Sequence, residues 1–179
     1  MTELKSFVTQ EEIKHLIRLA EERFKRSTTV ESKEDPNRTS YSAFLVKSED
    51  EVVRRIERRV CDLTNISLDM LEPFQVVRYS KNQQYRPHHD YFQNIQPTDS
   101  QRTVSIFVYL QSVPDDCGGG TIFPKLKMRF KPDSGDALMW SNVKDDNNTP
   151  DESTLHGGEP VTCDEIKYGL NIWFRSQKW

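Results

Sequence analysis

The sequence predicts an α+β chain, mainly β, in which two helices support a two-sheet roll or barrel. Two amphipathic helical patterns come first in the chain. From Glu72 onward the apolar residues change from helical to alternating spacing, and about eight short strand-like runs follow, separated by turns. We expect one domain over residues 1–179, with helical support at 1–70 and a β core at 72–179.

Length and composition exclude several classes of protein. The chain has 179 residues, of which 35% are hydrophobic and 30% charged, and its net charge is −3. These values describe one globular domain and not a disordered chain. Charges of both signs are interspersed, so we expect no nucleic acid partner. No apolar run approaches the ~20 residues that span a bilayer, so we expect no membrane contact.

The N-terminal residues Met1–Phe7 contain no apolar region of the kind found in signal peptides. We therefore expect a cytoplasmic location, or the endoplasmic reticulum if an N-terminal segment has been removed. Three cysteines, Cys61, Cys117 and Cys163, share no metal-like spacing. We expect them to be free thiols in a reducing compartment, with at most one disulfide, and assign them no function.

Both expected helices have recognisable N-termini. Thr9-Gln10-Glu11-Glu12 is a capping box that begins an amphipathic helix of about four turns. Ser48-Glu49-Asp50-Glu51 resembles a second capping box and begins another helix. The apolar sides are formed by Ile13, Leu16, Ile17, Ala20 and Phe24 in the first helix and by Val52, Val53, Ile56, Val60 and Leu63 in the second. We expect both helices to pack against a sheet without carrying chemistry.

The expected strands are short and lie after the helices. They span residues 74–79, 84–91, 103–111, 121–123, 127–131, 136–140, 158–162 and 168–175. Turn signals such as Pro114–Gly120 and Pro132–Asp136 separate them. Two polar loops, residues 93–101 and 144–153, bury little and are expected to be mobile at the strand ends. They are either flanks of a site or ordinary surface connections.

A His-x-Asp pair stands out as a candidate metal-binding motif. In an extended segment alternate side chains point to the same face, so His88 and Asp90 converge while His89 faces away. An imidazole and a carboxylate at this spacing supply two of the three protein ligands of a non-haem Fe(II) facial triad. His156 is better placed than His15 to supply the third ligand. By itself the pair also fits a surface histidine beside a solvated acid.

Lys167 is the second unusual residue, because it lies in the strand-like run Lys167–Phe174. A charge cannot be left unpaired in an apolar interior, since its desolvation costs several kcal/mol. Lys167 therefore either points outward or meets an anionic ligand inside the protein.

Together these motifs resemble the prolyl 4-hydroxylase family of Fe(II)- and 2-oxoglutarate-dependent dioxygenases. The resemblance covers most of the chain and is dense from about Tyr79 to Trp173. It is carried by Arg38-Thr39-Ser40, Tyr79, Tyr85–Asp90, Arg102–Ser105, Tyr109-Leu110, Gly119–Pro124, Gly135–Trp140, His156 with Pro160-Val161, and Lys167–Trp173. It implies a double-stranded β-helix, or jelly roll, as the fold of the catalytic core at 72–179.

The resemblance also implies how metal and co-substrate are bound. The implied iron ligands are His88, Asp90 and His156. Lys167 would pair with the distal carboxylate of 2-oxoglutarate, and the hydroxyl of Tyr79 would help to hold it. Ser105 lies where the family often has a threonine and is a further candidate for co-substrate binding. The implied cofactors are Fe(II), 2-oxoglutarate and O2, with ascorbate as reductant.

The implied reaction is hydroxylation of peptidyl-proline to 4-hydroxyproline, with succinate and CO2 as co-products. The partner would be a proline-containing peptide or protein, which arrives pre-extended for an aromatic groove. Tyr85 and Trp173 match aromatic positions at the peptide-binding mouth, and Arg175 stands where some relatives have a histidine near the substrate. Tyr91 or Trp140 could join this groove, although core packing is favoured for Trp140.

Two departures from the family pattern concern the second half of the chain. The interval from His156 to Lys167 is about one residue longer than usual, so we expect the turn between them to bulge. Glu159 stands where many relatives have a small residue or a cysteine. Two other functions stay open at this point: an oxygenase acting on another protein side chain or a free amino acid, and an inactive jelly-roll binding module.

Overall fold

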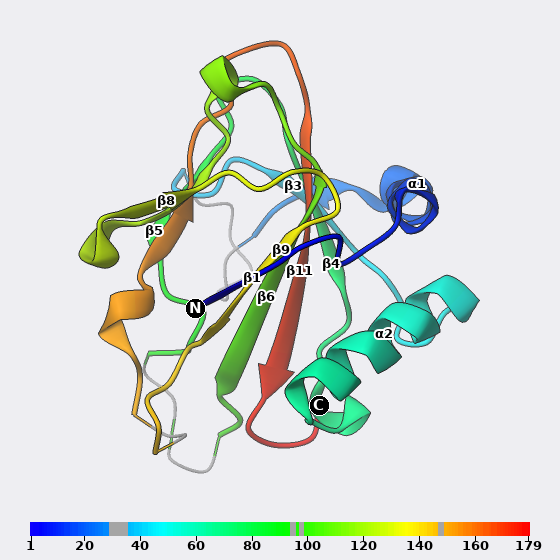
Figure 1. The fold of residues 1–179 in the computed structure, drawn as a ribbon, viewed down its shortest axis with the longest axis vertical. Helices are drawn as coiled ribbons and strands as arrows, with labels where there is room; N and C mark the ends of the chain where they lie inside the picture. Colours follow the sequence, from blue (N-terminus) through cyan, green and yellow to red (C-terminus); the bar gives the residue numbers. More distant parts are fainter. Residues whose placement is uncertain (29–35, 94–95, 97–98, 147–148) are drawn as a thin grey trace.

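Two facing antiparallel sheets form the fold of the computed structural model, which describes residues 1–28, 36–93, 96, 99–146 and 149–179 (Figure 1). One sheet has seven strands in the order β1-β9-β6-β11-β4-β3-β2, and the other has four in the order β5-β10-β7-β8. The expectation of a mainly β, two-sheet jelly roll supported by helices is confirmed.

The strands of the larger sheet lie at both ends of the chain and in its middle. They are β1 (Thr2–Leu4), β2 (Lys25–Arg26), β3 (Tyr41–Phe44), β4 (Gln75–Tyr79), β6 (Arg102–Gln111), β9 (Ala137–Ser141) and β11 (Lys167–Arg175). The smaller sheet consists of β5 (Tyr85–His88), β7 (Thr121–Phe123), β8 (Met128–Phe130) and β10 (His156–Gly158). The first 70 residues thus contribute three strands to the larger sheet in addition to the expected helices.

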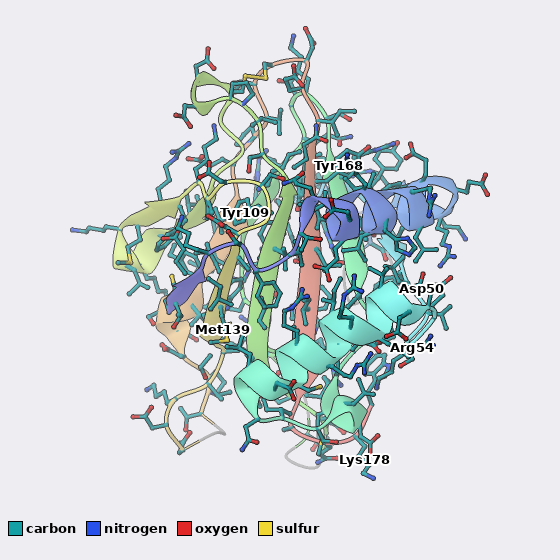
Figure 2. The ribbon with its side chains drawn as sticks, turned by 45° about the vertical axis from the view of Figure 1, so that its right-hand side comes forward. Asp50, Arg54, Tyr109, Met139, Tyr168 and Lys178 are labelled. Carbon is teal, nitrogen blue, oxygen red and sulfur yellow. A yellow bond between two sulfur atoms is a disulfide. The ribbon has the colours of Figure 1, made fainter. Side chains whose placement is uncertain are left out.

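Two α-helices, α1 (Gln10–Ala20) and α2 (Glu51–Thr64), lie across the outer face of the larger sheet (Figure 2). Short 3-10 turns occur at η1 (Glu21–Arg23), η2 (Leu68–Met70), η3 (Asp115–Cys117), η4 (Pro124–Leu126) and η5 (Glu152–Thr154). In the part of the chain that the structure describes, no helix is both long and apolar enough to cross a membrane.

The first capping box is confirmed, whereas the second is wrong. Thr9 accepts from the backbone N–H of Glu12, and the Glu12 carboxylate accepts from that of Thr9. Helix α2 is instead capped by Asp50, whose carboxylate accepts from the N–H of Val53. Ser48 precedes the cap with a positive φ of 55°, and its hydroxyl donates to Glu57. Asp50 directly precedes the first helical turn and therefore caps the helix in place of Ser48.

Alternation along the strands of the larger sheet divides the interior into two clusters. Val76 of β4 packs with Leu16 of α1 and Ile56 of α2 on the helical side. Val77, its neighbour in the chain, packs with Phe107 of β6 on the side that faces the smaller sheet. This two-faced burial follows from the period of two along a strand. The space between the sheets is the one that matters for function, because it opens into a cavity.

One expected strand is displaced along the chain. Residues 158–162 were expected to form it, but β10 pairs at His156–Gly158 and stops before Pro160. Proline has no backbone N–H to donate to a ladder, which explains the early end. The pairing of β10 with β5 shifts register between His156 and Gly158, so the irregularity lies inside the strand itself.

The expectation of free thiols holds for Cys61 alone, and the chain forms one disulfide, the most that was expected. Cys117 and Cys163 form a disulfide with their Cα atoms 5.3 Å apart, whereas Cys61 is a free cysteine that packs against the helical cluster. The loop before β7 and the loop before β11 meet here, since the N–H of Thr162 donates to the carbonyl of Cys117 at 2.9 Å. This proximity depends on the pairing of distant segments, which cysteine spacing alone does not reveal.

Candidate active site

Neighbouring strands of the smaller sheet bring together the three residues proposed from the sequence. His88 at the end of β5 is the register partner of His156 at the start of β10, and their ring centroids lie 4.4 Å apart. Asp90 follows β5 by two residues and turns the same way. One ligand atom from each of these three side chains lies within 4.8 Å of the others. Such a group can hold a metal ion.

The histidine tautomers are set by the backbone. Nδ1 of His88 lies 3.0 Å from the carbonyl oxygen of Arg86, and Nδ1 of His156 lies 2.8 Å from that of Thr154. Because a carbonyl oxygen only accepts, each Nδ1 carries the proton and each Nε2 keeps a free lone pair. The Nε2 atoms lie 3.7 Å and 3.6 Å from oxygens of Asp90. The two Nε2 lone pairs and the Asp90 carboxylate therefore lie around one space, where a metal ion could bind all three.

Burial also sets the charges of the group. It lowers the pKa of His156 to about 4, although the Asp90 carboxylate acts in the opposite direction. Burial alone would raise the pKa of Asp90, but the nearby imidazoles and the Arg102 guanidinium hold it well below its ordinary value. A neutral imidazole and an ionised carboxylate are the forms that bind metal.

Ser105 and Trp173 both contact Asp90. The Ser105 hydroxyl donates to Oδ2 of Asp90 at 2.7 Å, and the indole N–H of Trp173 donates to the same oxygen at 3.0 Å. Ser105 was expected to bind the co-substrate and Trp173 the substrate. The structure places Ser105 behind the metal-binding group, while Trp173 both touches Asp90 and lines the cavity.

His89 lies apart from the metal-binding group. Its Nε2 is 3.6 Å from Glu152, and its ring stacks on Tyr91 with centroids 4.5 Å apart. The Tyr91 hydroxyl donates to the other oxygen of Glu152 at 2.6 Å. Glu152 lies at the end of the second polar loop, in η5, so this part of the loop contacts His89 and Tyr91.

A cavity of about 1340 Å³ contains the metal-binding group and continues inward to Lys167. Lys167 is 2% exposed and opens β11. Its ammonium nitrogen lies 5.5, 5.1 and 5.3 Å from the ring centroids of Tyr79, Phe107 and Tyr109. No acidic side chain among the described residues lies within 4.0 Å of it. Burial lowers the pKa of Lys167 to about 7, opposed in part by Glu159.

Sequence reasoning gave no role to Thr121, at the closed end of the cavity, or to Phe123, beside His156. Thr121 lies 2.5 Å from the Tyr109 hydroxyl, directly after the run Gly118–Gly120. That glycine run was a usable signal, because it lets the chain approach closely. Phe123 stacks on His156 at 5.5 Å, and Trp140 meets the same ring edge-on at 4.7 Å. Trp140 is therefore both a core residue, as favoured, and part of the cavity wall.

The open end of the cavity holds the residues expected at a substrate mouth. Tyr85 stacks on His88 with centroids 3.5 Å apart and planes inclined by 16°. Arg175 donates to Glu72 at 3.2 Å and to the Ser100 hydroxyl at 3.3 Å. The first polar loop also lines the cavity, through Gln93, Asp99 and Ser100. In the two loops expected to be mobile, positions 94–95, 97–98 and 147–148 lie outside the described residues.

A jelly roll that gathers two histidines, an aspartate and a buried lysine around one cavity defines the class of non-haem iron oxygenases that use a 2-oxo acid. Residues 74–175 match the model of the 2OG-Fe(II) oxygenase superfamily. The chain is 36% identical to probable prolyl 4-hydroxylase 10 of Arabidopsis thaliana over 97% of its residues, and it spans 66% of that relative's length. The chain belongs to the prolyl 4-hydroxylase family of this superfamily.

Solved structures show the same fold. The viral collagen prolyl hydroxylase of Paramecium Bursaria Chlorella virus-1, in complex with 2OG, matches with a TM-score of 0.81 and 25% identity, covering 98% of this chain and 96% of that one. A Trichoplax adhaerens prolyl hydroxylase, in complex with a peptide fragment of the hypoxia inducible factor oxygen degradation domain, matches with a TM-score of 0.70 and 17% identity. It covers 97% of this chain and 82% of that one.

Proposed function

We propose that this chain is an Fe(II)- and 2-oxoglutarate-dependent dioxygenase that converts peptidyl-proline to 4-hydroxyproline, with succinate and CO2 as co-products. The observation that carries the proposal is one cavity lined by both the metal-binding group and a buried lysine that forms no ion pair within 4.0 Å among the described residues. The names of its relatives support the choice of proline.

The residues present fit a ferrous ion. The ligands would be Nε2 of His88, Nε2 of His156 and a carboxylate oxygen of Asp90, a facial set that leaves coordination positions for small molecules. With 2-oxoglutarate and dioxygen, the bound iron supplies the oxidising power that replaces a ring hydrogen of proline by hydroxyl. Ascorbate would keep the metal ferrous. The protein's own part is to fix the ligands, align the substrates and exclude water.

The closed end of the cavity fits the distal carboxylate of 2-oxoglutarate. Lys167 would provide the charge, and the hydroxyls of Tyr79 and Thr121, which line the same end, would donate hydrogen bonds. Burial raises the pKa of the Tyr79 phenol, so it stays a donor. Filling this end with a dicarboxylate would remove the cost of burying the ammonium alone.

The open end would bind the peptide. Tyr85 and Trp173 offer aromatic faces beside the metal-binding group, and Arg175 lines the same mouth. A polyproline II segment carries its backbone carbonyls outward and loses little entropy on binding, so such a mouth suits it.

The test is succinate release from purified protein with Fe(II), 2-oxoglutarate, ascorbate and a proline-containing peptide. We expect peptide-stimulated succinate and one added oxygen atom on proline, both detected by mass spectrometry, and neither in an Asp90→Ala variant. An added oxygen on another side chain would overturn the choice of proline. Absence of iron binding would overturn the enzyme assignment and favour a jelly-roll binding module.

A further inference from the structure

A directed chain of buried hydrogen bonds ends on the carboxylate of Asp90. The indole N–H of Trp140 donates to Oδ1 of Asn142 at 2.9 Å, and Nδ2 of Asn142 donates to the Ser105 hydroxyl at 2.8 Å. Ser105 donates to Oδ2 of Asp90 at 2.7 Å, where the Trp173 indole also donates. All of these side chains are buried, and Asn142 is completely inaccessible to solvent.

The direction of this chain follows from the chemistry of its first member. An indole N–H only donates, so the Asn142 atom that faces Trp140 must be the oxygen. The amide nitrogen is then turned toward Ser105, where it donates. A hydroxyl has one proton, and because its oxygen already accepts from Asn142, that proton is free to point only toward Asp90. The amide of Asn142 thus decides where the Ser105 proton goes.

We propose that Asn142 is a positioning residue that directs the Ser105 hydroxyl onto Oδ2 of Asp90 and so fixes the orientation of the carboxylate beside the imidazoles of His88 and His156. This inference rests on the proposed function, since it assigns Asn142 to the same metal site. With two donors on Oδ2, the carboxylate cannot rotate without breaking buried hydrogen bonds, which is costly. The aspartate is therefore held in one orientation before metal arrives.

The position of Asn142 is secured without its side chain. Its backbone N–H donates to the carbonyl of Thr103 at 2.8 Å, and its own carbonyl accepts from the N–H of Asp151 at 2.9 Å. Among the described residues, its amide group hydrogen-bonds with Trp140 and Ser105. Burying an amide side chain costs free energy, and the backbone hydrogen bonds at this position would form without that side chain. A role toward Asp90 accounts for it.

The test is the affinity of the whole chain for Mn(II), which stays divalent in air, measured by isothermal titration calorimetry. For Asn142→Leu, which keeps the shape and removes the amide, we expect binding about 10- to 100-fold weaker. Ser105→Ala should weaken binding similarly. The double variant should be no weaker than the worse single variant, within about threefold, because both act through one hydroxyl. Gln111→Leu is the control for removal of an amide: its amide donates to the backbone carbonyl of Ile166 and it does not line the cavity, so Mn(II) affinity should not change.

The possible results distinguish failure of the metal site from failure of the role of Asn142. Wild-type protein that binds no Mn(II) overturns the proposed metal site itself. Normal wild-type binding with an unchanged Asn142→Leu variant overturns the role of Asn142 alone. Fully additive losses in the double variant would also overturn it, because Asn142 would then not act through Ser105. If Asn142→Leu fails to fold, Trp140→Phe removes the indole N–H that fixes the amide and keeps an aromatic ring beside His156. Several-fold weaker Mn(II) binding is expected for that variant, and unchanged binding would contradict the directed chain.

Discussion

Lys167 of β11 and Tyr79 of β4 are cross-strand partners at the closed end of the cavity. The ammonium nitrogen lies 5.5 Å from the centroid of the tyrosine ring, and aromatic residues of β6 flank it on the other side. Desolvation lowers the pKa of Lys167 to about 7; Glu159 raises it and Lys131 lowers it further. Without an anion, Lys167 therefore changes charge near neutral pH.

The affinity for 2-oxoglutarate is expected to fall as pH rises above about 7. The dicarboxylate binds the charged ammonium, so above the lowered pKa of Lys167 each binding event must also take up a proton. The dissociation constant should then rise by up to about tenfold per pH unit. Calorimetric titration of Mn(II)-loaded protein with 2-oxoglutarate between roughly pH 6 and pH 9 measures this dissociation constant. Lys167→Arg should flatten the profile, because arginine stays charged. A flat wild-type profile would mean that the lysine does not meet the dicarboxylate.

Removing the charge from the closed end of the cavity separates its role from that of the metal ligands. For Lys167→Ala we expect the concentration of 2-oxoglutarate needed for turnover to rise by at least about tenfold, with Mn(II) affinity retained. Succinate release at varied co-substrate, together with calorimetry, measures both. If co-substrate affinity stays unchanged, the charge must come from elsewhere in the cavity, and Arg175 becomes the candidate.

Adjacent histidines should respond oppositely to the same substitution. His88→Ala removes an Nε2 that faces Asp90, so metal binding should be lost, at least by about 100-fold. His89→Ala removes a ring whose Nε2 lies near Glu152, and metal affinity should stay within a few-fold of wild type. Mn(II) titration of the two variants checks this. A loss confined to His89→Ala would show that the wrong histidine had been chosen.

The geometry of the metal-binding group was largely predictable, whereas its support was not. Alternation along an extended segment placed His88 and Asp90 together, because a period of two is local information. The sequence favoured His156 over His15 as the third member of the group, but the proximity of His156 to His88 depends on the β5–β10 pairing of distant residues. The helices were predictable for the same local reason. The exception is the N-cap of α2, which is Asp50 and not Ser48, two residues earlier.

What the sequence could not show were contacts between strands far apart in the chain. Asn142 reads as an ordinary loop residue, and its link to Ser105 exists because β9 pairs with β6 in one register. Ser105 was accordingly assigned to the co-substrate, although its hydroxyl donates to Asp90. The disulfide partners were hidden in the same way, because no local pattern brings Cys117 beside Cys163.

A buried ion-pair group holds the segments at the open end of the cavity. Both oxygens of Glu72 accept from Arg102 at 2.7 Å, and Arg175 donates to it at 3.2 Å. The Arg102 guanidinium lies 3.7 Å from the centroid of Trp173, so the pair also supports that indole. Glu72→Gln would leave two half-buried cations without a counter-charge.

We expect Glu72→Gln to lower the free energy of unfolding by about 3 kcal/mol, the low end for breaking a buried ion pair, because both guanidinium groups keep some contact with water. Urea unfolding monitored by tryptophan fluorescence measures the change. The matched control is Glu51→Gln, which breaks solvent-exposed pairs with Arg54 and Arg58 and should matter far less. Equal effects of the two substitutions would show that burial adds nothing at Glu72.

The disulfide should stabilise the closed end of the cavity more than the metal-binding group. Cys117 lies just before Thr121 and Cys163 just before Lys167, so the bridge ties together the two loops that carry these cavity residues. Replacing both cysteines by serine should lower the free energy of unfolding by about 2–4 kcal/mol, because the bridge closes a long loop.

We also expect the double serine variant to bind 2-oxoglutarate more weakly, with little change in its affinity for Mn(II). Cys61→Ser, at the free thiol, should alter neither affinity. If the double serine variant unfolds at the same urea concentration as wild type and binds 2-oxoglutarate equally well, the bridge is not a restraint on this end of the cavity.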